Sequence, residues 1–276
     1  MVTLCSILLG AWFIYEVKHP PLPAPAPATN PAAATATPTA TGTPATAANT
    51  TTTAAYTFHT NAPEQLLVIT NADGRYTFTS RGGGIKSVEL PGYPETVSAR
   101  WKKEVTTNGV ATLNTDAPLP VLALLGNEKL IGDGNFTLTK TAHGVQAEKM
   151  LPDGLRLVKE FQLSSNFLVN ASIRLENVSD QPITLPAQEW VVGTATRMGP
   201  DDNGLTLGAM WSDGTNSAKN CMLSYFSTNT TTLFVFPRTP KSEYREGNGN
   251  VAWAAVHNQF FTLIAMPKVP AAAVVA

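Results

Sequence analysis

Apolar and polar residues alternate with a period of two through most of the chain beyond residue 64, which is the pattern of β-strands with one buried face. In the clearest run, FLVNASIRLEN (167–177), five apolar residues would share one face: Phe167, Val169, Ala171, Ile173 and Leu175. LRLVKEFQL (155–163) lies before it across a short connection at 164–166, and GVQAEKM (144–150) lies before that across a turn at 151–154. The segment 144–177 is therefore predicted to be a three-stranded antiparallel meander.

Further strands are predicted wherever short apolar runs are bounded by turn residues. They cover residues 66–70, 75–79, 85–90, 136–140, 188–194, 231–237, 251–257 and 259–267. The last run, QFFTLIAMP, is apolar on both faces and is predicted to be a fully covered strand. Helical periodicity is weak, and the region 199–219 is rich in loop residues. Many strands at hairpin spacing predict an all-β fold, a large antiparallel β-sandwich.

The first part of the chain has a different character. Between Lys18 and Glu64 lie 45 residues without a charge, dominated by Pro, Ala and Thr. Such a tract has few large apolar side chains to bury, and its prolines favour extended backbone. We therefore predict an apolar N-terminal helix at 1–18, a disordered linker at 19–63 and a β domain at 64–276.

Three interpretations of the apolar head remain open. The stretch from Val2 to Tyr15 is shorter than the about 20 apolar residues that a spanning helix needs. A membrane anchor is favoured by Trp12 and Tyr15, whose rings suit the membrane interface. A cleaved signal peptide is the second interpretation, although no basic region precedes the head and prolines surround the cut. A buried core helix is the third, but a Pro-rich spacer follows at once.

Composition narrows the classes of partner and compartment. Cys5 lies in the head and Cys221 in the β domain, so a disulfide between them is not expected, and the domain would fold without one. This fits a Gram-negative periplasm better than a small cystine-rich secreted protein. The formal net charge is −1 and no basic stripe is present, which makes nucleic acid an unexpected partner.

Acid–base chemistry on a sugar would need a histidine and a carboxylate together. The β domain and its border offer His59, His143 and His257, and Glu189 lies beside Trp190, where a carboxylate could face an aromatic platform. The alternative is that these are ordinary polar residues at strand ends. We assign no catalytic and no cofactor-binding residue to them.

Other residue groups have two interpretations each. The tryptophans Trp101, Trp190, Trp211 and Trp253 could line a cleft, but rings in a sandwich more often belong to its core. Arg81 beside three glycines could form an anion nest, yet a hairpin turn explains the glycines. Asp201 and Asp202 with Asp213 lack the spacing of a calcium loop, so no metal site is assigned.

The order of these segments resembles a known family. An apolar head and a Pro-rich tether are followed by FTSRGGGIKSVELPGYP with its Gly83–Leu90 run, by the Lys159–Asn177 meander, and by Trp253–Phe261 with its Asn-Gln-Phe-Phe ending. The chain is similar to the N-terminal part of a bacterial YidC-type membrane protein insertase. The likeness extends over nearly the whole chain, including the tether.

The resemblance implies a fold, a function and a location. The family's periplasmic domain is a β-supersandwich similar to sugar mutarotases, held at the inner membrane. Its function would be the insertion of inner-membrane client proteins, alone or beside the Sec translocon, with the membrane contacted through the N-terminal helix. No small-molecule substrate and no cofactor are implied, and the domain itself would not be an enzyme.

The likeness also has a large departure. In the family, insertion belongs to five further transmembrane helices that form a wet groove with an arginine, and no second long apolar run follows Tyr15 here. We therefore expect that the 276 residues are part of a longer protein that extends beyond both ends, and that they form a docking or support domain. The alternatives are a membrane-anchored carbohydrate-binding or epimerase-like sandwich, and a plain adhesion or scaffold domain.

Overall fold

The computed structural model describes residues 58, 61–95, 109–199, 202–215, 217–227 and 240–276. All of them belong to the compact unit Thr51–Ala276. The predicted head (1–18) and all but the last residues of the predicted linker (19–63) lie outside the described residues, as do the predicted strand 231–237, His59, Trp101 and Asp201.

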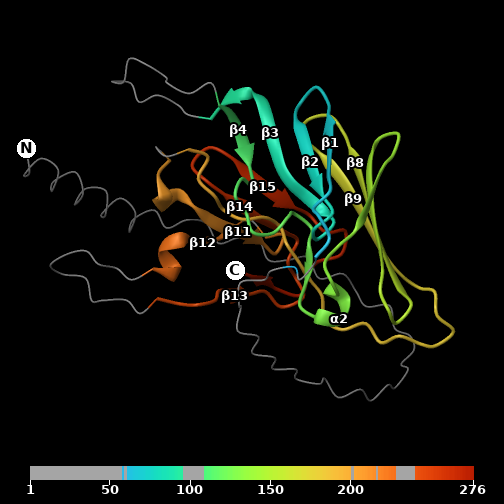
Figure 1. Cartoon of the computed structure of the whole chain (residues 1–276). Coiled ribbons are helices and arrows are strands. Elements are labelled where there is room, and N and C mark those ends of the chain that lie inside the picture. The colour runs from blue at the N-terminus through green and yellow to red at the C-terminus, as the bar shows by residue number, and fades with distance from the viewer. Residues whose placement is uncertain (1–57, 59–60, 96–108, 200–201, 216, 228–239) are drawn as a thin grey trace, which may run out of the picture. The chain divides into compact units, whose positions relative to one another are not determined.

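The first sheet is built from consecutive hairpins (Figure 1). Its strands are β1 (Leu66–Thr70), β2 (Arg75–Thr79), β3 (Gly84–Pro94) and β4 (Val110–Leu113), paired antiparallel in the order β1-β2-β3-β4. The turn between β2 and β3 holds Gly82 at φ 73° and Gly83 at φ 57°, conformations in which glycine avoids the clash of a side chain. The three-glycine hairpin turn predicted from the sequence is therefore confirmed.

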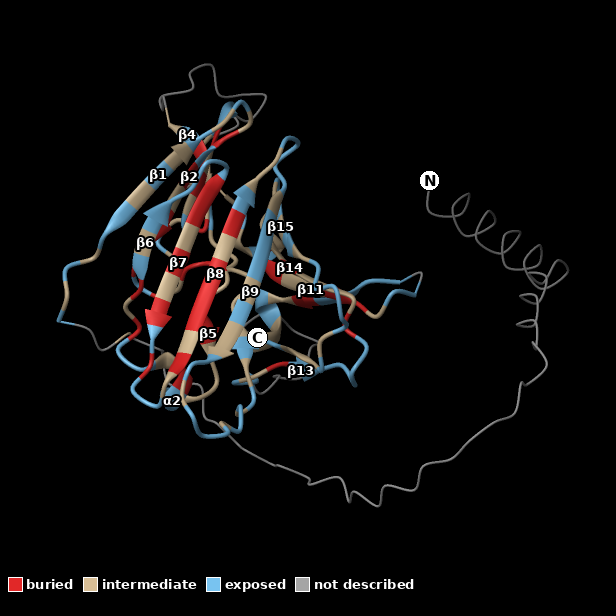
Figure 2. Ribbon diagram, turned by 90° about the vertical axis from the view of Figure 1, so that its right-hand side faces the viewer, coloured by how far each residue is buried: buried red, intermediate tan, exposed pale blue. Residues whose placement is uncertain are grey.

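The second sheet contains the predicted meander. It consists of β6 (Thr137–Lys140), β7 (Gly144–Met150), β8 (Leu155–Leu163) and β9 (Val169–Asn177), in that order and all antiparallel. β7 and β8 are buried along much of their length, whereas β9 at the edge is largely exposed (Figure 2). The prediction of three hairpin-connected strands over 144–177 is thus confirmed, with β6 added before them.

These two sheets share the main hydrophobic core. Alternate residues of β2 and of β8 face it, and the rings of Phe78 and Phe161 lie 5.2 Å apart between their centroids. Both rings are almost completely buried. A period of two in each strand places one apolar face against the other sheet and leaves the second face in water, which is why the alternation predicts the sandwich.

A third sheet carries a second, smaller core. It consists of β11 (Gly208–Ser212), β12 (Lys219–Met222), β14 (Trp253–His257) and β15 (Thr262–Ala265), in the order β12-β11-β14-β15. Trp211, Cys221, Tyr244 and Val251 are buried beneath it. The indole Nε1–H of Trp211 donates to the hydroxyl of Tyr244 at 2.9 Å, so the large ring is buried with its polar atom satisfied.

Short elements complete the described part of the chain. They are β5 (Leu124–Leu125) paired with β10 (Glu189–Trp190), β13 (Arg245–Glu246) paired with β16 (Val274–Val275), the helix α2 (Glu128–Ile131), and the 3₁₀ turns η1 (Gly204–Thr206) and η2 (Leu223–Phe226). Within the ranges that the structure describes, no helix has the length and apolar character needed to cross a bilayer. The fold is all-β and antiparallel, as the sequence predicts.

Four local predictions were wrong. The run 259–267 is not a covered strand: β15 is short, lies at a sheet edge, and leaves Ile264 53% exposed. The predicted strand 188–194 is reduced to β10, and the loop-rich region 199–219 contains β11, a central strand. Phe167 does not begin a strand but lies in the β8–β9 turn, 48% exposed.

The shared core gives a first testable expectation. Phe161→Ala removes a ring that packs on Phe78 between the two sheets, so we expect the free energy of unfolding to fall by about 3–5 kcal/mol. Urea unfolding followed by circular dichroism measures the loss. Phe260→Ala, which truncates an exposed ring, is the matched control and should change stability little. Equal losses in the two variants would contradict this assignment of the core.

Candidate functional site

The residues that could perform acid–base chemistry lie in separate elements. His143 is exposed in the β6–β7 turn, His257 ends β14, and Glu189 is in β10, which pairs with β5. The ring nitrogens of His257 lie 3.4 Å from the Asn258 carbonyl and the Asn220 side-chain oxygen. Among the described residues, no hydrogen bond joins either histidine to Glu189. Neither described histidine is therefore paired with Glu189 as acid–base chemistry on a sugar requires.

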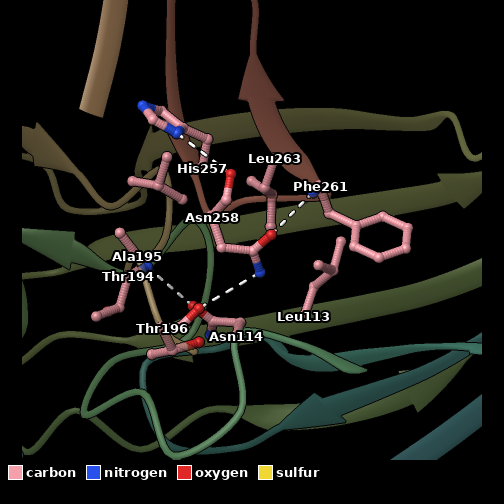
Figure 3. A pocket seen from close by; sticks show the side chains of 10 residues that line it. Leu113, Asn114, Thr194, Ala195, Thr196, His257, Asn258, Phe261 and Leu263 are labelled. Atoms are coloured by element: carbon pink, nitrogen blue, oxygen red, sulfur yellow. Dashed lines mark hydrogen bonds between the residues drawn. The ribbon is translucent and has the colours of Figure 1, made fainter. Parts of the chain in front are cut away.

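His257 does line a small cavity (Figure 3). The other lining residues come from three separate segments: Leu113, Asn114, Thr194, Ala195, Thr196, Val256, Asn258, Phe261 and Leu263. Its volume is about 20 Å³, which holds about one water molecule. A sugar ring does not fit, and no carboxylate lines the cavity.

Two asparagines at this cavity hold chain segments together. The Asn114 amide donates to the carbonyls of Lys86 and Leu119, and its Oδ1 accepts the backbone N–H of Thr194 at 3.0 Å. The Asn258 side-chain oxygen accepts the backbone N–H of Phe261 at 2.8 Å (Figure 3). It also accepts the backbone N–H of Phe260 at 2.9 Å. Their side chains are thus occupied in fixing loops, and the cavity between them is a structural junction.

A larger hollow of about 410 Å³ lies at β6 and β7. Its lining is polar except for Met150: Asp133, Asn135, Thr137, Thr139, Glu148 and Lys149. Lys149 pairs with Asp133 and Arg156 pairs with Glu148, so the charges of the hollow already have partners. No aromatic ring lines it, so a sugar has no stacking platform there.

The remaining candidates have mostly structural positions. Trp211 is 1% exposed in the second core, which confirms a core role for this ring, while Trp190 and Trp253 are half-buried. Asp202 accepts the N–H of Met198, and Asp213 accepts the N–H and hydroxyl of Thr215. Within the described ranges, no group of acidic, histidine or cysteine side chains could hold a metal ion.

Lys159 was not identified as a candidate from the sequence, although the alternation of apolar and polar residues in β8 places it on the buried face. Lys159 lies between Leu157 and Phe161 on the inward face of β8, and it is completely buried. Its Nζ donates to the carbonyls of Gly82 and Leu122, both at 2.7 Å. A lysine at an inward position of an alternating strand is the sequence signal that predicts a buried cation.

The environment of Lys159 is apolar and aromatic. The ring centroid of Phe136 lies 4.6 Å from its Nζ and that of Trp190 lies 5.5 Å away, distances at which the ring faces attract a cation. Burial, with a smaller contribution from the positive charge of Lys149, lowers the pKa of Lys159 to about 7. Lys159 thus binds the β2–β3 turn and the corner at Leu122 to the middle of β8.

A second feature missed by sequence reasoning is an exposed apolar surface at one end of the sandwich, where several turns meet. Its members are Tyr93, Phe167, Leu168 and Phe260, which are 45%, 48%, 55% and 46% exposed. We call these four residues the tip surface. The Tyr93 ring lies 6.4 Å from that of Phe167 and packs edge-on at 5.4 Å against that of Phe261. The end of β3, the β8–β9 turn and the segment between β14 and β15 therefore meet in one aromatic cluster.

Phe167 is held in an unfavourable conformation to reach this surface. Asn166 and Phe167 both have φ 59°, as in the hairpin turns that favour Asn-Gly. A bulky residue with positive φ costs about 1–2 kcal/mol relative to glycine. Stability alone would therefore favour glycine at position 167.

Residues 66–274 match the family model of the YidC periplasmic domain. The chain belongs to this family. A search among curated proteins found no match.

Membership in the YidC periplasmic domain family defines the setting of the sandwich. Such a domain lies on the periplasmic side of a membrane protein, and it is a component of an insertase rather than of an enzyme. The motifs that resemble YidC fall on features that the structure makes prominent. Gly83–Leu90 forms part of the β2–β3 turn and the first half of β3. Lys159–Asn177 contains the buried lysine and the turn that carries Phe167. Trp253–Phe261 contains β14 and the turn that carries Phe260.

The buried lysine predicts a dependence of stability on pH. The folded pKa of Lys159 is about 7 and its ordinary value is 10.5, so between these values the unfolded chain binds a proton that the folded chain has released. Stability should therefore rise with pH in this window, by up to about 1.4 kcal/mol per unit. Urea unfolding at about pH 7 and about pH 9 measures the slope. Lys159→Met should remove this contribution, whereas Lys140→Met on an exposed strand should keep it. Equal slopes in all three proteins would contradict the lowered pKa of a buried Lys159.

The turn predicts a gain of stability on substitution. Phe167→Gly relieves the positive φ and creates an Asn-Gly turn, so we expect the free energy of unfolding to rise by about 0.5–1 kcal/mol. Leu168→Gly is the control, because Leu168 is similarly exposed but has no positive φ. Thermal unfolding should place these variants on opposite sides of the unchanged protein. A loss of stability in Phe167→Gly would show that the ring contributes more than its backbone costs.

Proposed function

We propose that this chain is a non-catalytic docking and support domain of a YidC-type insertase, which assists the insertion of inner-membrane proteins alone or together with the Sec translocon. The N-terminal apolar helix would anchor it, and the uncharged linker would hold the sandwich on the periplasmic side. The observation that carries the proposal is the family match over residues 66–274.

The outer face of the second sheet supports a position in water. Arg156 bridges Glu148 and Glu176 across three strands, and Arg174 contacts Glu160 and Glu176. These charged groups are partly exposed and would lose their hydration in hydrocarbon, where an unsatisfied polar group costs several kcal/mol. The sandwich is therefore suited to contact clients and partners beside the membrane, while a client's passage through the bilayer needs a different structure.

The separation of the candidate acid and base supports a docking role over an epimerase. His143, His257 and Glu189 lie in separate elements, and the cavity at His257 holds about one water molecule. The exposed rings at the tip surface and the ion pairs on β9 are features of contact surfaces. A domain with this distribution of residues acts by binding.

The proposal predicts docking without insertion. Full-length chain added to vesicles that contain purified Sec translocon should be recovered with them in greater amount than with vesicles of the same lipids lacking translocon. In cells depleted of their own insertase, the chain should neither restore growth nor restore insertion of a client, as measured by protease accessibility. Equal recovery from both kinds of vesicle would contradict the Sec partnership, and restored insertion would contradict the supporting role.

The carbohydrate-binding alternative has its own discriminating measurement. Titration calorimetry with glucose and galactose should give no binding heat if the domain is a docking module. A saturable heat that disappears in Glu189→Gln but not in Glu243→Gln would favour the sugar-binding sandwich, because Glu189 is the carboxylate that the sequence places next to Trp190 and Glu243 is not.

A further inference from the structure

The packing of the fold does not explain why the side chains of the tip surface are exposed. Tyr93 lies near the end of β3 and the other three residues lie in turns. All four are exposed apolar side chains near the contacts of the Tyr93 ring with Phe167 and Phe261, and exposed apolar side chains that gather at one place usually mark an interaction site. None of the four carries a charge, and Tyr93 alone has a polar atom on its side chain. The occupant should therefore accept apolar side chains with little electrostatic contribution.

The cluster is held in place before any ligand arrives. Asn258 fixes the turn that carries Phe260 through two hydrogen bonds from backbone N–H groups. The side-chain amide of Asn71, in the β1–β2 turn, donates to the Ser164 carbonyl at the start of the turn that carries Phe167. A preorganised cluster loses little conformational freedom when it binds.

The direction of the strands places the tip surface relative to the tether. β8 ends at Leu163, beside this surface, and β1 also runs towards it, because the β1–β2 turn is bonded to Ser164. β1 begins at the other end, where the Ser80 N–H donates to the Gln65 carbonyl. The linker therefore enters the sandwich at the end opposite the tip surface.

The length of the linker allows the tip surface to reach a bilayer that holds the head. The nine residues of β8 span about 30 Å, which is the distance that the chain must pass along the sandwich. Forty-five uncharged residues lie between Lys18 and Glu64. Any chain of that length has a root-mean-square end-to-end distance of about 35–40 Å as a flexible coil and reaches about 140 Å when extended. Anchoring by the head would hold the tip surface at a high local concentration near the lipid.

We propose that the tip surface, formed by Tyr93, Phe167, Leu168 and Phe260, docks into the interfacial layer of the bilayer that holds the apolar head. This proposal rests on the anchoring in the proposed function. Exposed aromatic and leucine side chains enter this layer without a matching pocket, which a folded protein partner would have to supply. Because the surface is uncharged, docking should depend little on salt or on anionic lipid.

A fluorescent label next to the tip surface tests the contact. Ser165→Cys, in a background with Cys5→Ser and with Cys221 buried, carries an environment-sensitive fluorophore, and the full chain is reconstituted into phosphatidylcholine vesicles. Lipids brominated near the headgroup should quench this label. A label at Asp153→Cys, in the exposed turn before β8 at its opposite end, should not be quenched.

Matched variants separate the tip surface from general hydrophobicity. Phe167→Ser, Leu168→Ser and Phe260→Ser combined should reduce quenching at position 165 about tenfold. Ile264→Ser with Met266→Ser removes two exposed apolar side chains outside the surface and should leave quenching unchanged. Equal quenching in vesicles with half phosphatidylglycerol, and at low and high salt, is expected. Thermal unfolding confirms that each variant keeps its fold.

Each other outcome overturns the proposal. Quenching at neither position, or equally at both, excludes tip-directed docking. If lipids do not quench the label but two chains crosslink through position 165, the surface belongs to a contact with a second copy of the chain. If the emission of the label changes only after Sec translocon is added, the surface belongs to a contact with a protein. Flotation of the chain with the vesicles reports on the head separately. A chain that floats without quenching refutes the tip proposal alone, while one that does not float refutes the anchoring as well.

Discussion

The burial of Lys159 between two apolar sheets is the constraint on which the rest of the sandwich depends. An ammonium group in this position must have acceptors, and it finds them in the carbonyls of Gly82 and Leu122. Both acceptor residues have positive φ, 73° and 61°, which turns their carbonyls towards the core. A leucine in that conformation is unfavourable, and its bond to Lys159 offsets part of the cost. The turn, the corner and the central strand are thereby fixed together.

The two ends of the sandwich differ as a consequence. The end near Gly82 is tied to the core by a buried cation, backbone carbonyls and the Phe136 ring. At the other end the turns are joined by surface aromatic contacts and by asparagine side chains, and four apolar residues remain exposed. The end near Gly82 is thus held by buried polar contacts, whereas the far end carries exposed apolar side chains, in a domain that belongs to the YidC periplasmic domain family.

The arrangement of the described residues does not support acid–base chemistry on a sugar. Catalysis on a sugar requires an acid and a base within reach of one ring, and here His143, His257 and Glu189 lie in separate elements. The cavity beside His257 is instead a junction where Asn114 and Asn258 satisfy loop backbone. Fold and function are thus separable, because a function depends on a few side chains whereas the fold depends on the apolar faces of its strands.

The sequence by itself determined the fold class, the meander and the family, because these depend on local alternation, on turn residues and on the order of motifs along the chain. The period of two in β7, β8 and β9 and the glycines at 82 and 83 predict their structures directly. Tertiary structure decided the rest. The apolar run around β15 is exposed because its strand lies at a sheet edge, and β11 is central although its sequence is rich in loop residues. At the tip surface the Tyr93 ring, near the end of β3, meets the rings of Phe167 and Phe261 from distant segments. No local pattern contains that proximity, since it arises only when the sheets pack.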